Sequence, residues 1–173
     1  MFAAIVMAIT LASPPQGQDT LTRKDTAVTP PPPTIEQIHY MEGLRTATRG
    51  VAQIRDGLNR ITRTQKADSL TRRRAARRLG GLCGTARTFI VSGRPRMQAT
   101  AYSDSLRILA KQVTVRLDSL TSALPQCEKT AGHDPNTVST NLTARLKSYD
   151  DALQAFRNAL KPDSTKAATS SNR

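Results

Sequence analysis

A seven-residue repeat of apolar side chains between residues 34 and 66 is the feature that most constrains the fold. Two series interleave in this repeat: Tyr40, Ala47, Ile54 and Ile61, with Leu44, Val51 and Leu58 between them. The alternating spacing of three and four residues puts both series on one helix face, which predicts a single long amphipathic helix. Thr34 is suited to cap its start, and Gln37 permits a capping box.

Two further stripes predict helices over residues 97–124 and 136–161. The first consists of Leu106, Leu109, Val113, Leu117, Leu120 and Leu124, and the second of Leu142, Leu146, Tyr149, Leu153, Phe156 and Leu160. Prolines bracket both segments: Pro95 and Pro125 the earlier, Pro135 and Pro162 the later. Proline suits the first turn of a helix and cannot continue one, so these positions predict starts and stops.

The stretch SLTRRRAARRLGGLCGTARTFIV (residues 69–91) also fits one amphipathic helix. At about 100° per residue, four arginines fall in one arc: Arg73, Arg74, Arg77 and Arg78. The apolar residues fall on the opposite arc: Ala75, Ala76, Leu79, Leu82, Cys83, Ala86, Phe89 and Ile90. Gly80 and Gly81 each disfavour a helix by about 1 kcal/mol relative to alanine, so a break or kink at this point stays open.

These four segments predict an all-α fold. Aromatic residues make up only 3% of the chain and tryptophan is absent, so leucine, isoleucine, valine and alanine must supply the core. Such a core suits helix packing better than a β-sandwich. Each helix must bury its apolar stripe against the others, which predicts a four-helix-bundle-like domain over residues 34–161 with a long first helix.

The two ends of the chain do not share this periodicity. Residues 1–12 include an apolar run of 11 residues, which is shorter than the roughly 20 of a membrane-spanning helix. Its length fits a signal peptide cut after Ala12, although no Lys or Arg precedes it; an apolar tail or an internal core helix is the alternative. Residues 13–33 predict a proline-rich disordered linker, and residues 162–173 predict a disordered tail.

Cys83 and Cys127 are the only cysteines in the sequence. An even number of cysteines in an exported chain favours a disulfide, and closing a loop of this length contributes about 4 kcal/mol in a chain-entropy treatment. Cys83 lies on the apolar arc of the second helix, and Cys127 is expected in a loop just beyond the third. The alternative is one buried and one exposed free thiol.

No pattern in the sequence predicts catalysis, a metal centre or a cofactor. His39 and His133 do not have the spacing of a metal site, and no phosphate-binding glycine loop, nucleophile elbow or HExxH motif occurs. Asp150 and Asp151 diverge by about 100° on a helix, whereas paired acid–base chemistry needs convergent groups. We therefore expect a protein that is not an enzyme.

The net charge of +13 is concentrated in one region. Residues 45–96 contain 14 Lys and Arg against Asp56 and Asp68, a balance of +12. Such a region attracts anionic partners, which makes four arginines candidate anion-binding residues: Arg73, Arg74, Arg77 and Arg78. A solvated helix face is the alternative. Nucleic acid is not an expected partner, because helix-turn-helix, zinc and aromatic stacking patterns are absent.

The segment ITRTQ (residues 61–65) resembles the L-T-x-x-Q motif of small periplasmic helical chaperones of the Spy/CpxP type. The resemblance covers five residues, begins with isoleucine and occurs once. It implies an exported helical protein that binds unfolded clients in a cradle. The chain as a whole predicts an exported, non-enzymatic binding or structural protein of the cell envelope, with anionic envelope components or unfolded proteins as partners.

Overall fold

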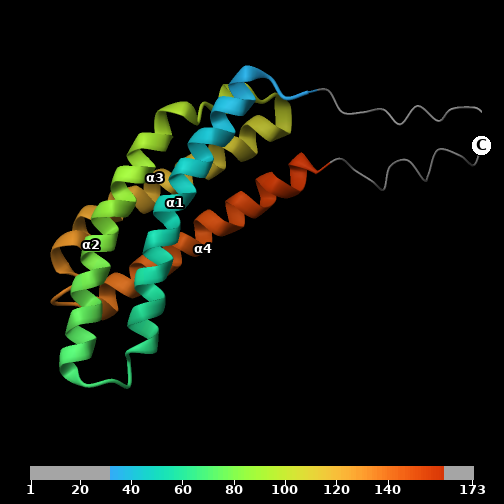
Figure 1. The fold of residues 1–173 in the computed structure, drawn as a ribbon. Coiled ribbons are helices and arrows are strands. Elements are labelled where there is room, and N and C mark those ends of the chain that lie inside the picture. The colour runs from blue at the N-terminus through green and yellow to red at the C-terminus, as the bar shows by residue number, and fades with distance from the viewer. Residues whose placement is uncertain (1–31, 162–173) are drawn as a thin grey trace, which may run out of the picture. The chain divides into compact units, whose positions relative to one another are not determined.

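The computed structural model describes residues 32–161, which form four α-helices (Figure 1). They are α1 (Ile35–Arg63), α2 (Ser69–Gly93), α3 (Asp104–Thr130) and α4 (Pro135–Leu160). This part of the chain contains no strand, so the predicted all-α, four-helix fold is confirmed. The predicted signal peptide, all but the last two residues of the predicted linker, and the predicted tail lie outside the described residues.

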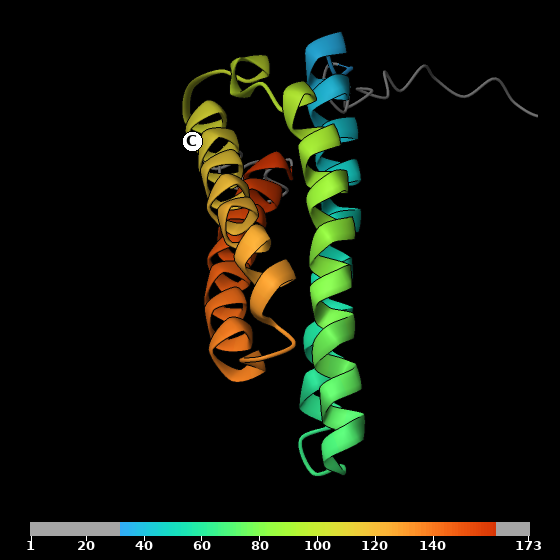
Figure 2. The same cartoon turned by 90° about the vertical axis from the view of Figure 1, so that its left-hand side faces the viewer.

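The four helices form two antiparallel hairpins. Figure 2 shows α1 and α2 as one pair and α3 and α4 as the other, with the two pairs side by side. The apolar stripes meet between the pairs and form one continuous core. None of the helices in the described part combines the length and the apolar character of a membrane-crossing segment.

The predicted stripes lie on the buried faces of the helices, except that Leu160 at the end of α4 is 38% exposed. On α1 the buried stripe consists of Tyr40, Leu44, Ala47, Val51 and Ile54, none more than 3% exposed. The side chain of Thr34 accepts from the backbone N–H of Gln37, and the side chain of Gln37 accepts from that of Thr34. The predicted capping box is therefore present, and it satisfies two N–H groups that a helix start leaves unpaired.

Small residues let α1 and α2 approach closely. Three buried glycines recur every seven residues on α1, at Gly43, Gly50 and Gly57. They face a matching series on α2, at Gly93, Ala86 and Leu79. A Cβ placed on Gly50 would lie 2.5 Å from the carbonyl oxygen of Ala86, and one on Gly43 would lie 2.6 Å from that of Gly93. A side chain at either glycine would therefore push the two backbones apart.

The prediction that the third helix starts near residue 97 is wrong, because α3 begins at Asp104. Two short 3-10 helices, Arg94–Arg96 and Ala99–Ala101, precede it, and Pro95 lies in the first of them. Met97 and Tyr102 in this connection are 1% and 4% exposed. The ring of Tyr102 packs edge-on against that of Tyr40, with 5.2 Å between centroids. Burial of these side chains compensates for the α-helical hydrogen bonds that the connection lacks.

The prediction that Pro125 ends the third helix is also wrong, because α3 continues to Thr130. Proline in a helix interior removes a hydrogen bond and disfavours the helix by about 3 kcal/mol. The apolar stripe nevertheless runs past the proline through Leu124, Cys127 and Ala131, none more than 1% exposed. Tertiary burial therefore outweighs the local penalty, and Cys127 lies in the last turn of α3 instead of a loop.

Helix α2 is continuous through Gly80 and Gly81. The two glycines have different surroundings. A Cβ added to Gly80 would lie 3.2 Å from the carbonyl oxygen of Glu128 in α3, whereas nothing lies within 4 Å of a Cβ on Gly81. Close packing against α3 therefore accounts for the first glycine but not for the second.

We expect Gly81→Ala to raise the free energy of unfolding by about 1 kcal/mol, because alanine loses less backbone entropy in a helix. Gly80→Ala is the matched control, and its gain should be smaller or reversed by the tight contact with Glu128. Urea unfolding followed by circular dichroism measures both variants. A Gly81→Ala protein no more stable than the wild type would argue against a continuous α2 in solution.

Candidate anion-binding surface

The four arginines singled out in the sequence lie on α2 as the helical projection predicts. Arg73, Arg74, Arg77 and Arg78 are exposed, whereas the apolar residues among them are buried: Ala75, Ala76 and Leu79. A solvated face and an anion-binding face would both have this arrangement. These two alternatives therefore differ only in what surrounds the arginines.

These arginines belong to a larger basic surface at the turn of the α1–α2 hairpin. Residues 58–78 contain eight basic residues and one acidic residue, a balance of 8 − 1 = +7, and we call this segment the basic end. Its cations are Arg60, Arg63, Lys66, Arg72, Arg73, Arg74, Arg77 and Arg78. The α1–α2 turn extends beyond the turn that joins α3 to α4 (Figures 1 and 2). The basic end is thus open to a large partner.

The one carboxylate of the basic end is engaged in capping α2. Asp68 accepts hydrogen bonds from the Thr71 hydroxyl at 2.6 Å and from the Thr71 backbone N–H at 2.9 Å. The bond from the hydroxyl is the main cause that lowers the pKa of Asp68, and the backbone bond acts in the same direction. Asp68 therefore caps the start of α2, and it forms no ion pair with the arginines among residues 32–161.

Most cations of the basic end have no carboxylate partner within residues 32–161. Arg60 pairs with Asp56 at 3.0 Å, and the other seven form no ion pair in this part of the chain. Elsewhere the arginines do pair between elements, as Arg94 does with Asp118 at 2.7 Å. The carboxylates of the described domain are thus used mainly away from the basic end.

The arrangement of the arginines is unfavourable for α2 by itself. Arg72 lies in its first turn, where the partial positive charge of the helix start disfavours cations. Arg73 and Arg74 each lie four residues before another arginine, Arg77 or Arg78, and a like-charge pair at this spacing destabilises a helix by roughly 0.2–0.5 kcal/mol. A bound anion would relieve both repulsions, so an anionic ligand is expected to stabilise the protein.

Two of the arginines also line a hollow between α2 and the end of α3, which we call the basic pocket. Its volume is about 590 Å³. Helix α2 contributes Arg73, Arg77 and Gly80, the last turn of α3 contributes Glu128 and Lys129, and the connection to α4 contributes Gly132 and His133. Arg74 and Arg78 are not among the lining residues. The structure therefore divides the four predicted arginines into two pairs.

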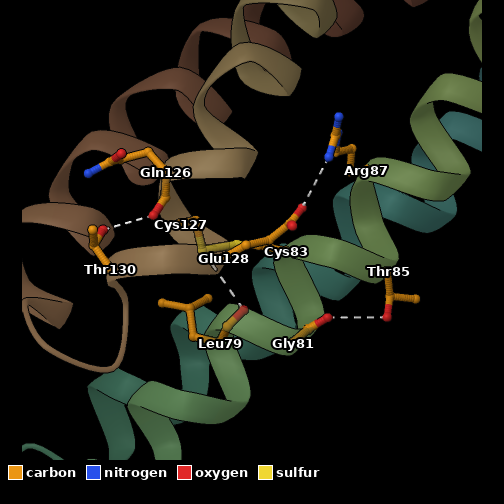
Figure 3. The surroundings of a disulfide bond; sticks show 9 residues. All are labelled: Leu79, Gly81, Cys83, Thr85, Arg87, Gln126, Cys127, Glu128 and Thr130. Carbon is orange, nitrogen blue, oxygen red and sulfur yellow. Dashed lines mark hydrogen bonds and ion pairs between the residues drawn. A yellow bond between two sulfur atoms is a disulfide. The ribbon is translucent and has the colours of Figure 1, made fainter.

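A disulfide connects the two walls of the basic pocket. The sulfur atoms of Cys83 and Cys127 lie 2.05 Å apart, so the cysteines that the sequence analysis pairs are at bonding distance (Figure 3). Gly80 lies one turn before Cys83, and Glu128 directly follows Cys127. Figure 3 also shows Glu128 directed toward Arg87 of α2, at 3.9 Å. This contact partly neutralises the one carboxylate of the pocket.

The remaining candidates from the sequence do not come together. Asp150 pairs with Arg55 of α1, whereas Asp151 pairs with Lys147 at 2.8 Å, so the two carboxylates diverge. His39 is exposed on α1, far along the chain from His133 of the basic pocket. Among residues 32–161, no three His, Cys, Asp or Glu side chains gather where they could hold a metal ion.

Lys129 and His133, which line the basic pocket together with Arg73 and Arg77, were not predicted from the sequence. They are far from Arg73 and Arg77 along the chain, and no short motif connects them. The predicted disulfide could have indicated that these residues lie near the arginines. Residues that follow Cys127 closely lie beside the part of α2 that precedes Cys83, and this part includes Arg77.

The segment ITRTQ lies at the end of α1. Ile61 packs against the core, and Thr64 is the residue that caps the C-terminus of α1. Comparisons with protein-family models, curated proteins and solved structures find no match to this chain. The resemblance to helical chaperones therefore rests on these five residues, and the implied client cradle stays a prediction.

Proposed function

We propose that this chain is an exported, non-enzymatic protein that binds a phosphate-bearing surface of the cell envelope through its basic end. The observation that carries the proposal is the set of seven cations in the basic end with no carboxylate partner among residues 32–161. Each Lys or Arg held near an anionic surface contributes about 1 kcal/mol of attraction. Several on one projecting turn are enough for reversible attachment.

Two observations support the export part of the proposal. Residues 2–12 have the length and apolar character of a signal-peptide core. The Cys83–Cys127 pair lies at bonding distance, and disulfides persist mainly in oxidising compartments. Mass spectrometry of protein from an envelope fraction, without reductant, should find a chain that starts at Ser13 with its cysteines joined. Retention of Met1 together with two free thiols would contradict export.

The attachment is tested with a fourfold variant that changes Arg73, Arg74, Arg77 and Arg78 to Gln. Vesicles of phosphatidylcholine with phosphatidylglycerol provide the anionic surface. At about 1 kcal/mol per residue the four changes remove about 4 kcal/mol, so we expect binding to weaken by roughly several hundredfold. Binding of the wild type should also fall steeply as added salt screens these exposed charges.

The matched control changes four other exposed arginines to Gln: Arg45, Arg49, Arg116 and Arg157. It removes the same charge from outside the basic end, so it should keep most of the affinity. If the two fourfold variants lose affinity equally, net charge and not the basic end is responsible, as expected for a merely solvated helix face. Vesicle binding that does not change with salt would contradict the electrostatic basis of the proposal.

A further inference from the structure

We infer that the basic pocket binds one phosphomonoester group, and that this group is what the basic end recognises on its anionic target. The inference rests on the proposed function and deepens it, since it names the chemical group and the residues that hold it. It assigns different roles to two pairs of arginines on one helix. Arg73 and Arg77 line the pocket, whereas Arg74 and Arg78 supply general attraction.

The charge of the pocket matches that of a phosphomonoester. Arg73, Arg77 and Lys129 contribute three positive charges and Glu128 one negative charge, so the lining carries 3 − 1 = +2 with His133 neutral. A phosphomonoester carries about −1.5 to −2 at pH 7, whereas the phosphodiester of phosphatidylglycerol carries one negative charge. The monoester therefore neutralises the pocket more completely.

The donors come from three elements and face one space. Arg73 and Arg77 are four residues apart, so they lie on one face of α2. Each guanidinium presents N–H groups in a planar fork that fits two oxygens of a phosphate. Lys129 approaches from the last turn of α3, and His133 from the connection to α4. A tetrahedral phosphate can use donors from several directions, which one helix face alone does not provide.

Two glycines, Gly80 and Gly132, line the pocket and add no side chain to it. A Cβ on Gly132 would contact the Cγ of Arg77 at 3.5 Å, and one on Gly80 would lie 3.2 Å from the carbonyl oxygen of Glu128. Longer side chains at these positions would extend into the space between α2 and the end of α3. The stem of Arg77 thus passes beside Gly132, and neither Arg73 nor Arg77 forms an ion pair among residues 32–161.

Capping of α3 is a competing explanation for positive charge at this place, because a helix C-terminus favours cations. Lys129, in the last turn of α3, already supplies such a charge. The carbonyl oxygen of Thr130 accepts from the backbone N–H groups of His133 and Asp134, both at 2.9 Å, and that of Cys127 accepts from Ala131 at 3.0 Å. Capping therefore does not explain why Arg73 and Arg77 also face the pocket.

The test compares two double variants by calorimetric titration with inorganic phosphate. Arg73→Gln/Arg77→Gln removes the donors of the pocket, and the loss of charge-assisted hydrogen bonds should weaken phosphate binding about tenfold or more. Arg74→Gln/Arg78→Gln removes the same charge from the same helix outside the pocket, and it should keep phosphate affinity within about twofold of the wild type. Lys129→Gln, on the opposite wall, should also weaken phosphate binding.

Vesicles distinguish the source of the group. At equal surface charge, the wild type should prefer vesicles with phosphatidic acid, a monoester, over vesicles with phosphatidylglycerol, and Arg73→Gln/Arg77→Gln should lose this preference. Saturable phosphate binding without the preference would support the pocket and assign it to a phosphomonoester outside the lipid surface.

Two results would overturn the inference: no saturable phosphate binding by the wild type, or an equal loss in both double variants. Either result leaves the proposed function intact if the fourfold variant binds phosphatidylglycerol vesicles more weakly than the wild type does, and if its control variant keeps most of the wild-type affinity. Phosphate binding without any vesicle binding would reject attachment to lipid and keep the pocket.

Discussion

Replacement of Cys83 and Cys127 together by alanine is expected to lower the free energy of unfolding by about 4 kcal/mol. The bridge joins residues with a sequence separation of 44. In the chain-entropy treatment, a cross-link across a loop of this size removes about 4 kcal/mol of conformational freedom from the unfolded chain. The native protein also loses contacts, because both cysteines are at most 1% exposed.

The place of the bridge in the fold adds to this effect. The α1–α2 and α3–α4 hairpins are joined by the backbone only through residues 94–103, at the start of α3. Cys127 lies at the other end of α3, so the disulfide attaches the second hairpin at its far end. Without the bridge the walls of the basic pocket are held by packing alone. We therefore expect the alanine variant to bind inorganic phosphate more weakly as well.

Urea unfolding followed by circular dichroism measures the stability change. The free energy of unfolding should fall more steeply with urea concentration in the alanine variant than in the wild type. The reason is that an unfolded chain without a cross-link exposes more surface. The Tm should fall by roughly 15 °C for a domain of this size. Wild-type protein unfolded under a reductant is the control and should behave like the variant. Equal stability of the variant and the oxidised wild type would show that the bridge does not constrain the chain.

The second large effect is expected at the contact between α1 and α2. Gly50→Ala places a Cβ 2.5 Å from the carbonyl oxygen of Ala86, 3.0 Å from Ile90 and 3.1 Å from Phe89. The nearest atom belongs to the backbone, so the two helices must separate. Such overpacking costs about 1–3 kcal/mol. We expect a net loss of about 2 kcal/mol in the free energy of unfolding, although alanine favours a helix over glycine.

Two other glycines provide the comparison for Gly50→Ala. A Cβ on Gly57 would meet first the Cδ1 of Leu79, at 2.6 Å, which is the end of a side chain that can rotate. Gly57→Ala should therefore cost less than Gly50→Ala, and Gly81→Ala should raise stability. Urea unfolding of the three variants gives this order directly. If Gly50→Ala is as stable as Gly81→Ala, α1 and α2 do not pack as closely as described.

Local sequence signals were sufficient where they agreed with burial. The heptad of α1 predicted Tyr40 through Ile54 as its buried face, and Thr34 with Gln37 predicted the cap. The projection of α2 separated the exposed arginines from the buried stripe that contains Cys83. These predictions succeeded because side-chain direction on a helix follows directly from its period.

Local signals failed where tertiary contacts opposed them. Pro125 is a strong local stop, but the stripe through Leu124 and Cys127 continues beyond it and is buried in the core. Pro95 starts a short 3-10 helix instead of α3, because Met97 and Tyr102 turn inward. The seven-residue series Gly43, Gly50 and Gly57 is visible in the sequence, but glycine does not contribute to an apolar pattern. The role of this glycine series in packing is shown only by the short distance between α1 and α2.

The sequence by itself determined the helices, their buried faces, the pairing of the only two cysteines and the region that carries the positive charge. These properties depend on the period of a helix and on composition, both of which are local. The tertiary structure decided where α3 begins and ends, how closely α1 and α2 approach, and which arginines meet Lys129 and His133. The pocket joins residues distant in sequence, and their proximity depends on how the two hairpins pack and on the bridge between them.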